Sequence, residues 1–252
     1  MMADLYTKNW IIKNVDTVLF DKDGTFIDAH VYWGRIIELR IQAVMNFYQV
    51  DDKYFDELCL SLGYDTKNKI LIEKGPIALL AREAVVNSLI EKLKELNINA
   101  VSSEIADIFK NVHEKFLDEI FDYVKPIKEA EVLFKRLKEK GVKLAVVTSD
   151  MKLNTDAILE KTNLAQYFDL VIGKDNCTKA KKTGEPALIA LKLLNANANT
   201  TISVGDAPMD YEMAKNANLK GSILVSTGQI PETKLKQLTD TTVQNLSEVI
   251  VK

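Results

Sequence analysis

The sequence predicts an α/β fold: a doubly wound parallel sheet with an all-helical domain inserted after its first strand. Two observations predict it. After residue 125, short apolar strands alternate with helices at the spacing of a parallel sheet. Between residues 28 and 124, apolar residues recur mainly at helical spacing. We therefore expect an α/β domain formed by residues 1–27 and 125–252, and a helical domain formed by residues 28–124.

The composition is that of a soluble globular protein, with 47% hydrophobic and 27% charged residues. The net charge of −3 offers no strongly basic face for nucleic acid. No apolar stretch reaches the length of a membrane-spanning helix, and the N-terminus lacks the pattern of a signal peptide. Cys59 and Cys177 form no CxxC pair, which argues against a disulfide framework and against zinc. We expect a cytoplasmic monomer or homodimer that binds neither nucleic acid nor membranes.

The first strand is predicted over residues 15–20, an apolar run that ends at two carboxylates. Asp21 and Asp23 are spaced i, i+2, so at a strand end they point to the same side, and Gly24 then permits a sharp turn. Such a pair can hold a hard cation, or divide the roles of nucleophile and acid/base. A calcium-binding EF-hand loop is excluded because its first ligand position would be Leu19.

The inserted region is predicted to be helical because its apolar residues recur every three or four positions. Ser103 is expected to start one of the helices. A loop or short hairpin is expected over residues 63–76, where Gly and Pro flank a brief apolar run. The apolar stripes would pack the helices against one another. The predicted helices cover residues 34–49, 51–62, 77–96 and 102–121.

After the insertion, strands and helices alternate. Pro126 is expected at the first position of a helix that Gly141 ends. Residues 142–147 form an unbroken apolar run, as in a parallel strand buried on both faces. In such sheets ligands bind beyond the carboxyl ends of the strands. Further strands are predicted over residues 170–172, 201–204 and 222–225, and helices over residues 126–137, 153–162, 186–194, 209–217 and 231–238.

Polar residues follow two of these later strands. Thr148 and Ser149 come after residues 142–147, where hydroxyl and backbone N–H groups can bind phosphate oxygens. Asp206 and Asp210 follow another strand with i, i+4 spacing, so both can face one cation. Asp210 is equally compatible with a first-turn residue that favours the helix dipole. These side chains and the first carboxylate pair are therefore expected at one edge of the sheet.

Together these stretches resemble the four motifs of the haloacid dehalogenase superfamily, and the insertion resembles its small helical cap. The first motif, DxDGT, matches residues 21–25, and the second, an apolar strand ending in Thr or Ser, matches residues 146–148. The fourth, GDxxxD, matches residues 205–210. Lys182 best matches the third, a lysine shortly before a helix that starts with proline. The resemblance covers essentially the whole chain and favours phosphoglycolate-phosphatase-like hydrolases.

The third motif departs from the pattern of the superfamily, in which the lysine is commonly followed by proline. Here Lys182 is followed by Thr183, and two further lysines lie close by. We interpret Lys179 and Lys181 as parts of a solvated basic loop. Lys182 is thus the best match to the third motif, while Lys181 and Lys179 stay open as alternatives for the lysine that faces the carboxylates.

The resemblance implies a Mg²⁺-dependent phosphatase that acts on a small phosphorylated metabolite. Asp21 would attack phosphorus and form an aspartyl-phosphate, and Asp23 would act as acid and then as base. The ion would bind Asp21, the Asp23 carbonyl and Asp206, with Asp210 as a water-mediated ligand or as support behind the ligands. Thr148 and Lys182 would stabilise the transferring group. The residues expected to bind substrate are Thr148, Ser149, Lys182 and Arg35.

Two alternatives stay open. A sugar-phosphate mutase of the β-phosphoglucomutase kind carries the same four motifs. A phospho-accepting regulatory protein without turnover also places Asp, Thr and Lys after parallel strands, but such receiver domains lack a carboxylate two residues past the acceptor. Asp23 argues against a dehalogenase and against a phosphonate hydrolase, because those branches carry an aromatic or a small residue at that position.

Overall fold

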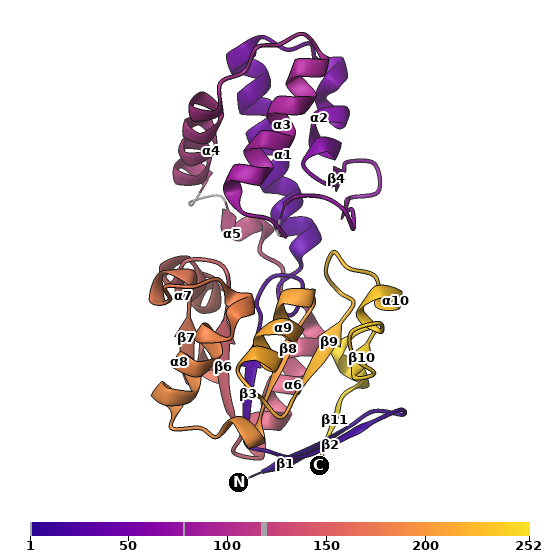
Figure 1. The fold of residues 1–252 in the computed structure, drawn as a ribbon, viewed down its shortest axis with the longest axis vertical. Helices are drawn as coiled ribbons and strands as arrows, with labels where there is room; N and C mark the ends of the chain where they lie inside the picture. The colour runs from indigo at the N-terminus through magenta and orange to yellow at the C-terminus, as the bar shows by residue number, and fades with distance from the viewer. Residues whose placement is uncertain (1, 78, 117–119) are drawn as a thin grey trace. The chain divides into compact units, whose positions relative to one another are not determined.

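The computed structural model describes residues 2–77, 79–116 and 120–252. The chain divides into two compact units, an α/β unit of residues 1–28 and 125–252 and a helical unit of residues 29–124 (Figure 1). Asp28, expected in the helical part, belongs to the α/β unit.

The α/β unit is built on a six-stranded sheet with the order β10-β9-β8-β3-β6-β7, in which every neighbouring pair is parallel. All four residues of the central strand β3 are buried, which explains why three of them, Val18, Leu19 and Phe20, are apolar. Phe20 at the end of β3 is opposite Val146 of β6 and Val204 of β8. Because these three strands end in register, the residues that follow them meet at one edge of the sheet. The strands are β3 (Thr17–Phe20), β6 (Lys143–Val147), β7 (Leu170–Ile172), β8 (Thr201–Gly205), β9 (Gly221–Val225) and β10 (Thr242–Val243).

Helices cover both faces of this sheet (Figure 1). Leu19 packs in a cluster with residues of α8 and α9, whereas the adjacent Phe20 contacts Phe134 of α6 with ring centroids 4.9 Å apart. Successive strand residues point to opposite faces, so the two contacts identify two separate core layers. The helices of this unit are α6 (Lys128–Glu139), α7 (Lys152–Lys161), α8 (Glu185–Leu194), α9 (Pro208–Asn216) and α10 (Glu232–Leu235), with 3₁₀ turns at Ala165–Tyr167, Lys174–Asn176, Lys181–Thr183, Ala198–Thr200 and Leu246–Glu248.

The predicted first strand is divided in the structure. Residues up to Val15 belong to a separate antiparallel sheet with the order β11-β1-β2, formed by β1 (Ala3–Tyr6), β2 (Ile11–Val15) and β11 (Ile250–Val251). Asn14 adopts a φ of 56°, and the Asp16 carboxylate accepts a hydrogen bond from Thr200 Oγ1 at 2.7 Å. The chain therefore changes sheets at this point, and the helical insertion follows the third strand of the chain, which is the first strand of the parallel sheet.

The start of the helix predicted from Pro126 is also wrong. Ile127 is extended and donates its backbone N–H to the Phe26 carbonyl at 2.9 Å, so α6 begins only at Lys128. Ile27 forms a bridge with Pro126, and Asp28 N–H donates to the Lys125 carbonyl at 2.8 Å. The two segments that connect the α/β unit to the helical unit are thus hydrogen-bonded side by side.

The helical unit has an apolar core of its own, which includes Ile41 of α1, Leu89 of α3 and Phe109 of α4, all fully buried. This core confirms that the apolar stripes pack the helices together. The expected short hairpin is present as β4 (Tyr64–Asp65) paired with β5 (Ile70–Leu71). The helix predicted over 102–121 runs from Ser102, and its residues 117–119 lie outside the described residues. The helices are α1 (Ala29–Tyr48), α2 (Phe55–Ser61) with a 3₁₀ turn at Asp52–Tyr54, α3 (Arg82–Glu95), α4 (Ser102–Phe116) and α5 (Ile120–Tyr123).

Candidate active site

Three carboxylates converge where β3 and β8 end. Asp21 follows β3, Asp206 follows β8 and Asp210 lies in the first turn of α9. One oxygen from each lies within 4.8 Å of the others. Asp206 and Asp210 are 7% and 1% exposed, so little water is available to screen their mutual repulsion. The three carboxylates thus meet at the sheet edge where the sequence placed them, whereas the Asp23 carboxylate, expected beside Asp21, is not among them.

Two glycines allow this convergence. Gly24 turns the chain with a φ of 83°, and its N–H donates to the Ile27 carbonyl at 2.8 Å. A Cβ atom at either Gly24 or Gly228 would overlap the Asp206 carboxylate. Gly228 belongs to the loop after β9, and the neighbouring Thr227 donates its hydroxyl to the Gly24 carbonyl at 2.6 Å. These two segments thus form a close cradle around Asp206.

Lys181, rather than the predicted Lys182, lies among the carboxylates. Its Nζ atom is 2.5 Å from Asp21 Oδ1 and 2.6 Å from Asp210 Oδ1, and its side chain is 3% exposed. The interpretation of Lys181 as solvated is therefore wrong. The Lys182 side chain is exposed, and its backbone carbonyl accepts a hydrogen bond from Asn216 Nδ2 at 2.7 Å. A single 3₁₀ turn ending at Gly184, whose φ is 85°, directs one lysine inward and the next outward.

The charges in this group perturb one another. Burial alone would lower the pKa of Lys181, but the carboxylates of Asp21 and Asp210 outweigh it and raise that pKa above its ordinary value. Burial raises the pKa of Asp206 well above its ordinary value, and the charges of Asp21 and Asp210 add to the effect. Burial likewise raises the pKa of Asp210 to about 6, against the opposing charge of Lys181.

This donor set fits a hard divalent cation. The crowded group has three buried or half-buried carboxylates against one ammonium, so a further positive charge is favourable, and oxygen is the ligand atom that Mg²⁺ prefers. Asp210 has both oxygens engaged, one by Lys181 and the other by the Ala207 N–H at 3.0 Å. Of the two expected roles, this arrangement favours support behind the ligands over a water-mediated ligand. Asp21 and Asp206 are then the side chains best placed to bind the ion directly.

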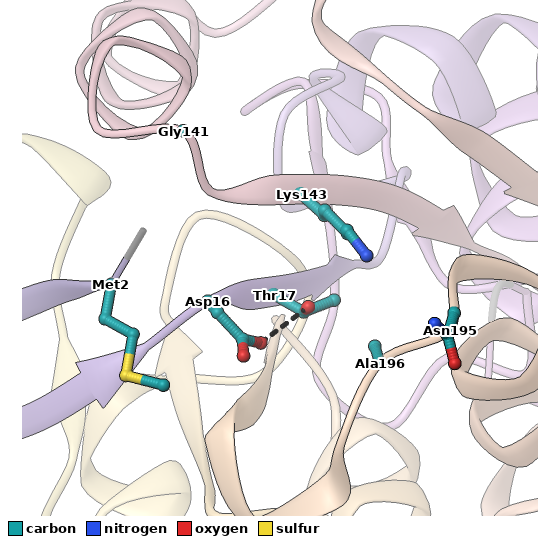
Figure 2. A pocket seen from close by; sticks show the side chains of 7 residues that line it. All are labelled: Met2, Asp16, Thr17, Gly141, Lys143, Asn195 and Ala196. Atoms are coloured by element: carbon teal, nitrogen blue, oxygen red, sulfur yellow. Dashed lines mark hydrogen bonds between the residues drawn. The ribbon is translucent and has the colours of Figure 1, made fainter.

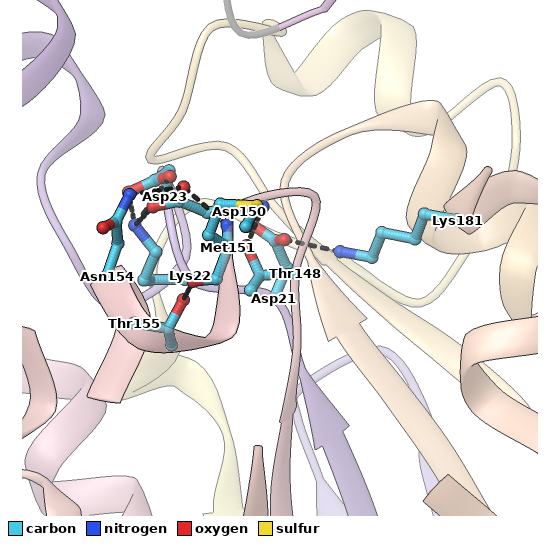
Figure 3. Close-up of polar contacts among 9 residues, drawn as sticks. All are labelled: Asp21, Lys22, Asp23, Thr148, Asp150, Met151, Asn154, Thr155 and Lys181. Carbon is cyan, nitrogen blue, oxygen red and sulfur yellow. Dashed lines mark hydrogen bonds and ion pairs between the residues drawn. The ribbon is translucent and has the colours of Figure 1, made fainter. Parts of the chain in front are cut away.

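The Asp23 carboxylate belongs to a second group (Figure 3). Its two oxygens lie 2.8 and 2.9 Å from Lys22 Nζ, which is also 3.3 Å from Asp150 Oδ2. Burial raises the pKa of Asp23 to about 6; Lys22 opposes this shift, and the negative charge of Asp150 adds to it. The Asp23 carboxylate is therefore not a candidate ligand of the cation. The prediction that Asp23 binds the cation applies only to its backbone carbonyl.

The hydroxyls after β6 differ in exposure. Thr148 is buried, and its Oγ1 accepts a hydrogen bond from the Asp150 N–H at 3.1 Å. Ser149 is exposed, with its hydroxyl 3.8 Å from Met209 Sδ. Arg35 belongs to α1 of the helical unit, where it lies 3.3 Å from Glu38 and 5.0 Å from the centroid of the Tyr123 ring. Its contact with a substrate remains a prediction.

Sequence reasoning missed four residues around the carboxylates: Lys22, Asp150, Thr227 and Gly228. A signal for Lys22 was present. It lies between two aspartates directly after a buried strand, where a buried ammonium group requires carboxylate partners. Thr227 and Gly228 follow the strand β9 without any charged residue to mark them.

A cavity of about 220 Å³ lies at the other edge of the sheet (Figure 2). Its lining includes Thr17 and Lys143, the first residues of β3 and β6, whereas Asp21 and Thr148 follow the last residues of these strands. This cavity is thus separated from the carboxylates by the length of the strands.

Within the described part of the chain, no helix is long and apolar enough to cross a membrane.

Comparisons with known proteins agree with this geometry. Residues 15–218 match the model of a haloacid dehalogenase-like hydrolase family. The chain is 27% identical to the phosphoglycolate phosphatase of Aquifex aeolicus, over 88% of this chain and 93% of the relative. It is 30% identical to the pyrophosphatase PpaX of Listeria welshimeri, over 81% of this chain and 80% of the relative.

The fold is also similar to solved structures. One is the β-phosphoglucomutase of Clostridium difficile, which superposes with a TM-score of 0.58 at 19% identity, over 93% of this chain and 92% of that one. At this identity the likeness shows the α/β fold with its helical insertion and carries no statement about activity.

Proposed function

The chain belongs to the haloacid dehalogenase-like hydrolase family, and from this premise we propose that it is a phosphatase that hydrolyses a small phosphomonoester through an aspartyl-phosphate on Asp21. The observation that carries the proposal is the position of Asp21. Its carboxylate is at a strand end, 13% exposed, with Oδ1 held by Lys181. The other oxygen is then free of that contact and available for attack on phosphorus.

Two steps complete the reaction. An Asp21 oxygen attacks phosphorus, the bond between phosphorus and the alcohol oxygen breaks, and Asp23 gives a proton to the leaving alkoxide. A water molecule then attacks the aspartyl-phosphate and gives a proton to Asp23, and the bond between phosphorus and Asp21 breaks. The products are the alcohol and inorganic phosphate, with both aspartates restored.

Positive charge and hydrogen bonds assist both steps. Lys181 takes the role that was predicted for Lys182, because it lies against Asp21 and can stabilise charge on the transferring group. Thr148, with the exposed Ser149 beside it, would bind phosphoryl oxygens. Asp21, Asp206 and the Asp23 carbonyl would hold Mg²⁺, and Asp210 would orient Lys181. When bound, Mg²⁺ supplies the positive charge that offsets the crowded carboxylates and the phosphoryl oxygens.

The relatives support a compact, strongly anionic substrate. One relative is called a phosphoglycolate phosphatase and another a pyrophosphatase, and phosphoglycolate-like esters are the substrate class that we propose. A cytoplasmic location, and Arg35 as a contact for a substrate carboxylate, are part of the same proposal. A sugar-phosphate mutase remains the second candidate, since it carries the same motifs.

Release of phosphate decides between these functions. We expect turnover of p-nitrophenyl phosphate and of phosphoglycolate with Mg²⁺, and loss of that turnover in Asp21→Asn with an unchanged melting temperature. A panel that includes pyrophosphate and β-glucose 1-phosphate with its bisphosphate tests the alternatives. Asp21→Asn activity within about tenfold of wild type would remove the nucleophile assignment, because loss of a nucleophile costs far more than this. Sugar-phosphate isomerisation without phosphate release would identify a mutase.

A further inference from the structure

Lys22 is among the largest fully buried side chains of the protein, with a side-chain exposure of 0%. An ammonium group buried in this way is costly unless carboxylates compensate it. Lys22 Nζ lies 2.8 and 2.9 Å from the two oxygens of Asp23 and 3.3 Å from Asp150 Oδ2. The ammonium group therefore joins the proposed acid and base to a second carboxylate.

Asp150 is itself held in place from several sides (Figure 3). Its Oδ1 atom accepts hydrogen bonds from the Met151 N–H at 2.7 Å and from Asn154 Nδ2 at 3.4 Å. Its own N–H donates to Thr148 Oγ1, and its carbonyl accepts from the Lys174 N–H at 2.8 Å. With Oδ1 anchored on the start of α7, Oδ2 is directed at Lys22. The position of the Lys22 ammonium group is thus determined by the end of β6 and the first turn of α7.

Stability alone is a weak reason for this arrangement. A buried ion pair can often be replaced by apolar side chains of similar volume without loss of stability. Residue 22 is fully buried, and an apolar residue is the usual choice at such a position. The ion pairs do, however, restrict the Asp23 carboxylate. Each carboxylate oxygen has two lone pairs, so an oxygen that accepts a bond from Lys22 can still accept a second bond. The Asp23 side chain is 14% exposed, so that second bond can be made to substrate or water.

We propose that Lys22 and Asp150 act as positioning residues that hold the Asp23 carboxylate in the orientation in which it exchanges a proton with the leaving group and with water. The inference rests on the proposed phosphatase function. In Lys22→Met the two carboxylates of Asp23 and Asp150 would face each other without a cation, and their repulsion would turn Asp23 away. Lys22→Arg retains the positive charge and has N–H donors for both carboxylates, so it should restore much of the orientation.

The leaving group reports this effect. An alkyl phosphate needs a proton on its leaving oxygen, whereas p-nitrophenolate hardly does, and general-acid help is typically worth ~10²–10⁴-fold. We expect Lys22→Met to lower kcat/KM for an alkyl phosphate about tenfold more than for p-nitrophenyl phosphate, in the same direction as Asp23→Ala. Asp150→Ala, which keeps Lys22 but removes its anchor, should show a smaller loss of the same kind. Lys192→Met, the same change at an exposed site on α8, should alter neither value.

The outcomes separate the two proposals. Equal losses for both substrates in a folded Lys22→Met protein would overturn the positioning role, and if this variant fails to fold, the Asp150→Ala ratio decides in the same way. A crystal structure of Lys22→Met gives a second measurement that needs no turnover. Displacement of the Asp23 carboxylate supports the positioning role, and an unmoved carboxylate refutes it. Absence of any phosphatase activity in the wild type, by contrast, refutes the proposed function while the crystallographic result still stands.

Discussion

At the scale of single residues, the clearest contrast is between two neighbouring lysines of one 3₁₀ turn, because only one of them reaches the carboxylates. Lys181 contacts Asp21 and Asp210 from a buried position, whereas the Lys182 side chain is exposed. The two side chains are chemically identical, because both end in an ammonium group. Only their positions distinguish the lysine that can act at the carboxylates from the one that cannot.

We predict that Lys181→Met lowers phosphatase kcat by about 10²-fold or more, as expected when one group that stabilises transition-state charge is removed. Lys182→Met is the matched control and should retain most of the activity. Steady-state kinetics on p-nitrophenyl phosphate, with melting curves for both variants, make the comparison. The reverse order of effects would restore the assignment to Lys182.

Protons and the cation should compete for the carboxylates. The pKa of Asp206 is raised well above its ordinary value and that of Asp210 to about 6, so the metal-free site takes up protons as the pH falls. The folded state then binds more protons than the unfolded state. The contribution of these groups to the free energy of unfolding is therefore most favourable at acidic pH and is lost as the pH rises through their raised pKa values. Mg²⁺ must displace those protons.

The expected result is that Mg²⁺ raises the melting temperature more at about pH 7.5 than at about pH 5.5. Asp206→Asn should abolish most of the Mg²⁺ effect at both values. A thermal shift series at constant ionic strength measures it. An increase that is the same at both pH values would show that these carboxylates do not bind the ion.

At the scale of elements, the loop after β9 determines where Asp206 can lie. A Cβ atom on Gly228 would overlap an Asp206 oxygen, whereas a Cβ on Gly221, at the start of β9, would meet only Ile12 Cδ1 at 4.0 Å. The same substitution at these two sites therefore separates an effect on the carboxylate from a general effect on the strand.

Gly228→Ala should weaken Mg²⁺ activation about 10–100-fold, the usual cost of disturbing the residues behind metal ligands. Gly221→Ala should leave the Mg²⁺ dependence unchanged. Titration of activity with Mg²⁺ gives the apparent affinity of each variant. Wild-type affinity in Gly228→Ala would mean that the loop adjusts and does not constrain Asp206.

At the scale of the whole molecule, each unit has its own core. The segments that enter and leave the helical unit meet within the α/β unit, where Asp28 N–H donates to the Lys125 carbonyl at 2.8 Å. A short linker can therefore connect these two points without stretching the sheet. The parallel strands and the residues at their carboxyl ends all belong to the α/β unit.

Replacement of residues 29–124 by a short Gly-Ser linker should leave an α/β unit that folds and retains some turnover of p-nitrophenyl phosphate. It should lose discrimination among small phosphates, because we expect the helical unit to act as a cap that excludes water and selects the leaving group. Circular dichroism and a substrate panel test both parts. Unchanged selectivity in the folded deletion protein would place substrate choice in the α/β unit.

The sequence by itself determined the α/β class, the insertion and the positions of Asp21, Asp206 and Thr148. These features follow from local patterns: the apolar period identifies strands, and the strand ends place the polar residues. The assignment of Val15 to one sheet and of residues 17–20 to another was not predictable in this way, because a local pattern does not reveal which strand each residue will pair with.

Only the tertiary structure decided which lysine enters the site and what Lys22 contacts. The direction of Lys181 depends on a 3₁₀ turn and on carboxylates that are distant in sequence, such as Asp21 at a separation of 160 residues. The partner of Lys22 depends on β6 lying beside β3, which brings Asp150 to the same strand ends. Side-chain direction and long-range pairing are set by packing between elements, and for that reason they follow from the fold and not from the local sequence.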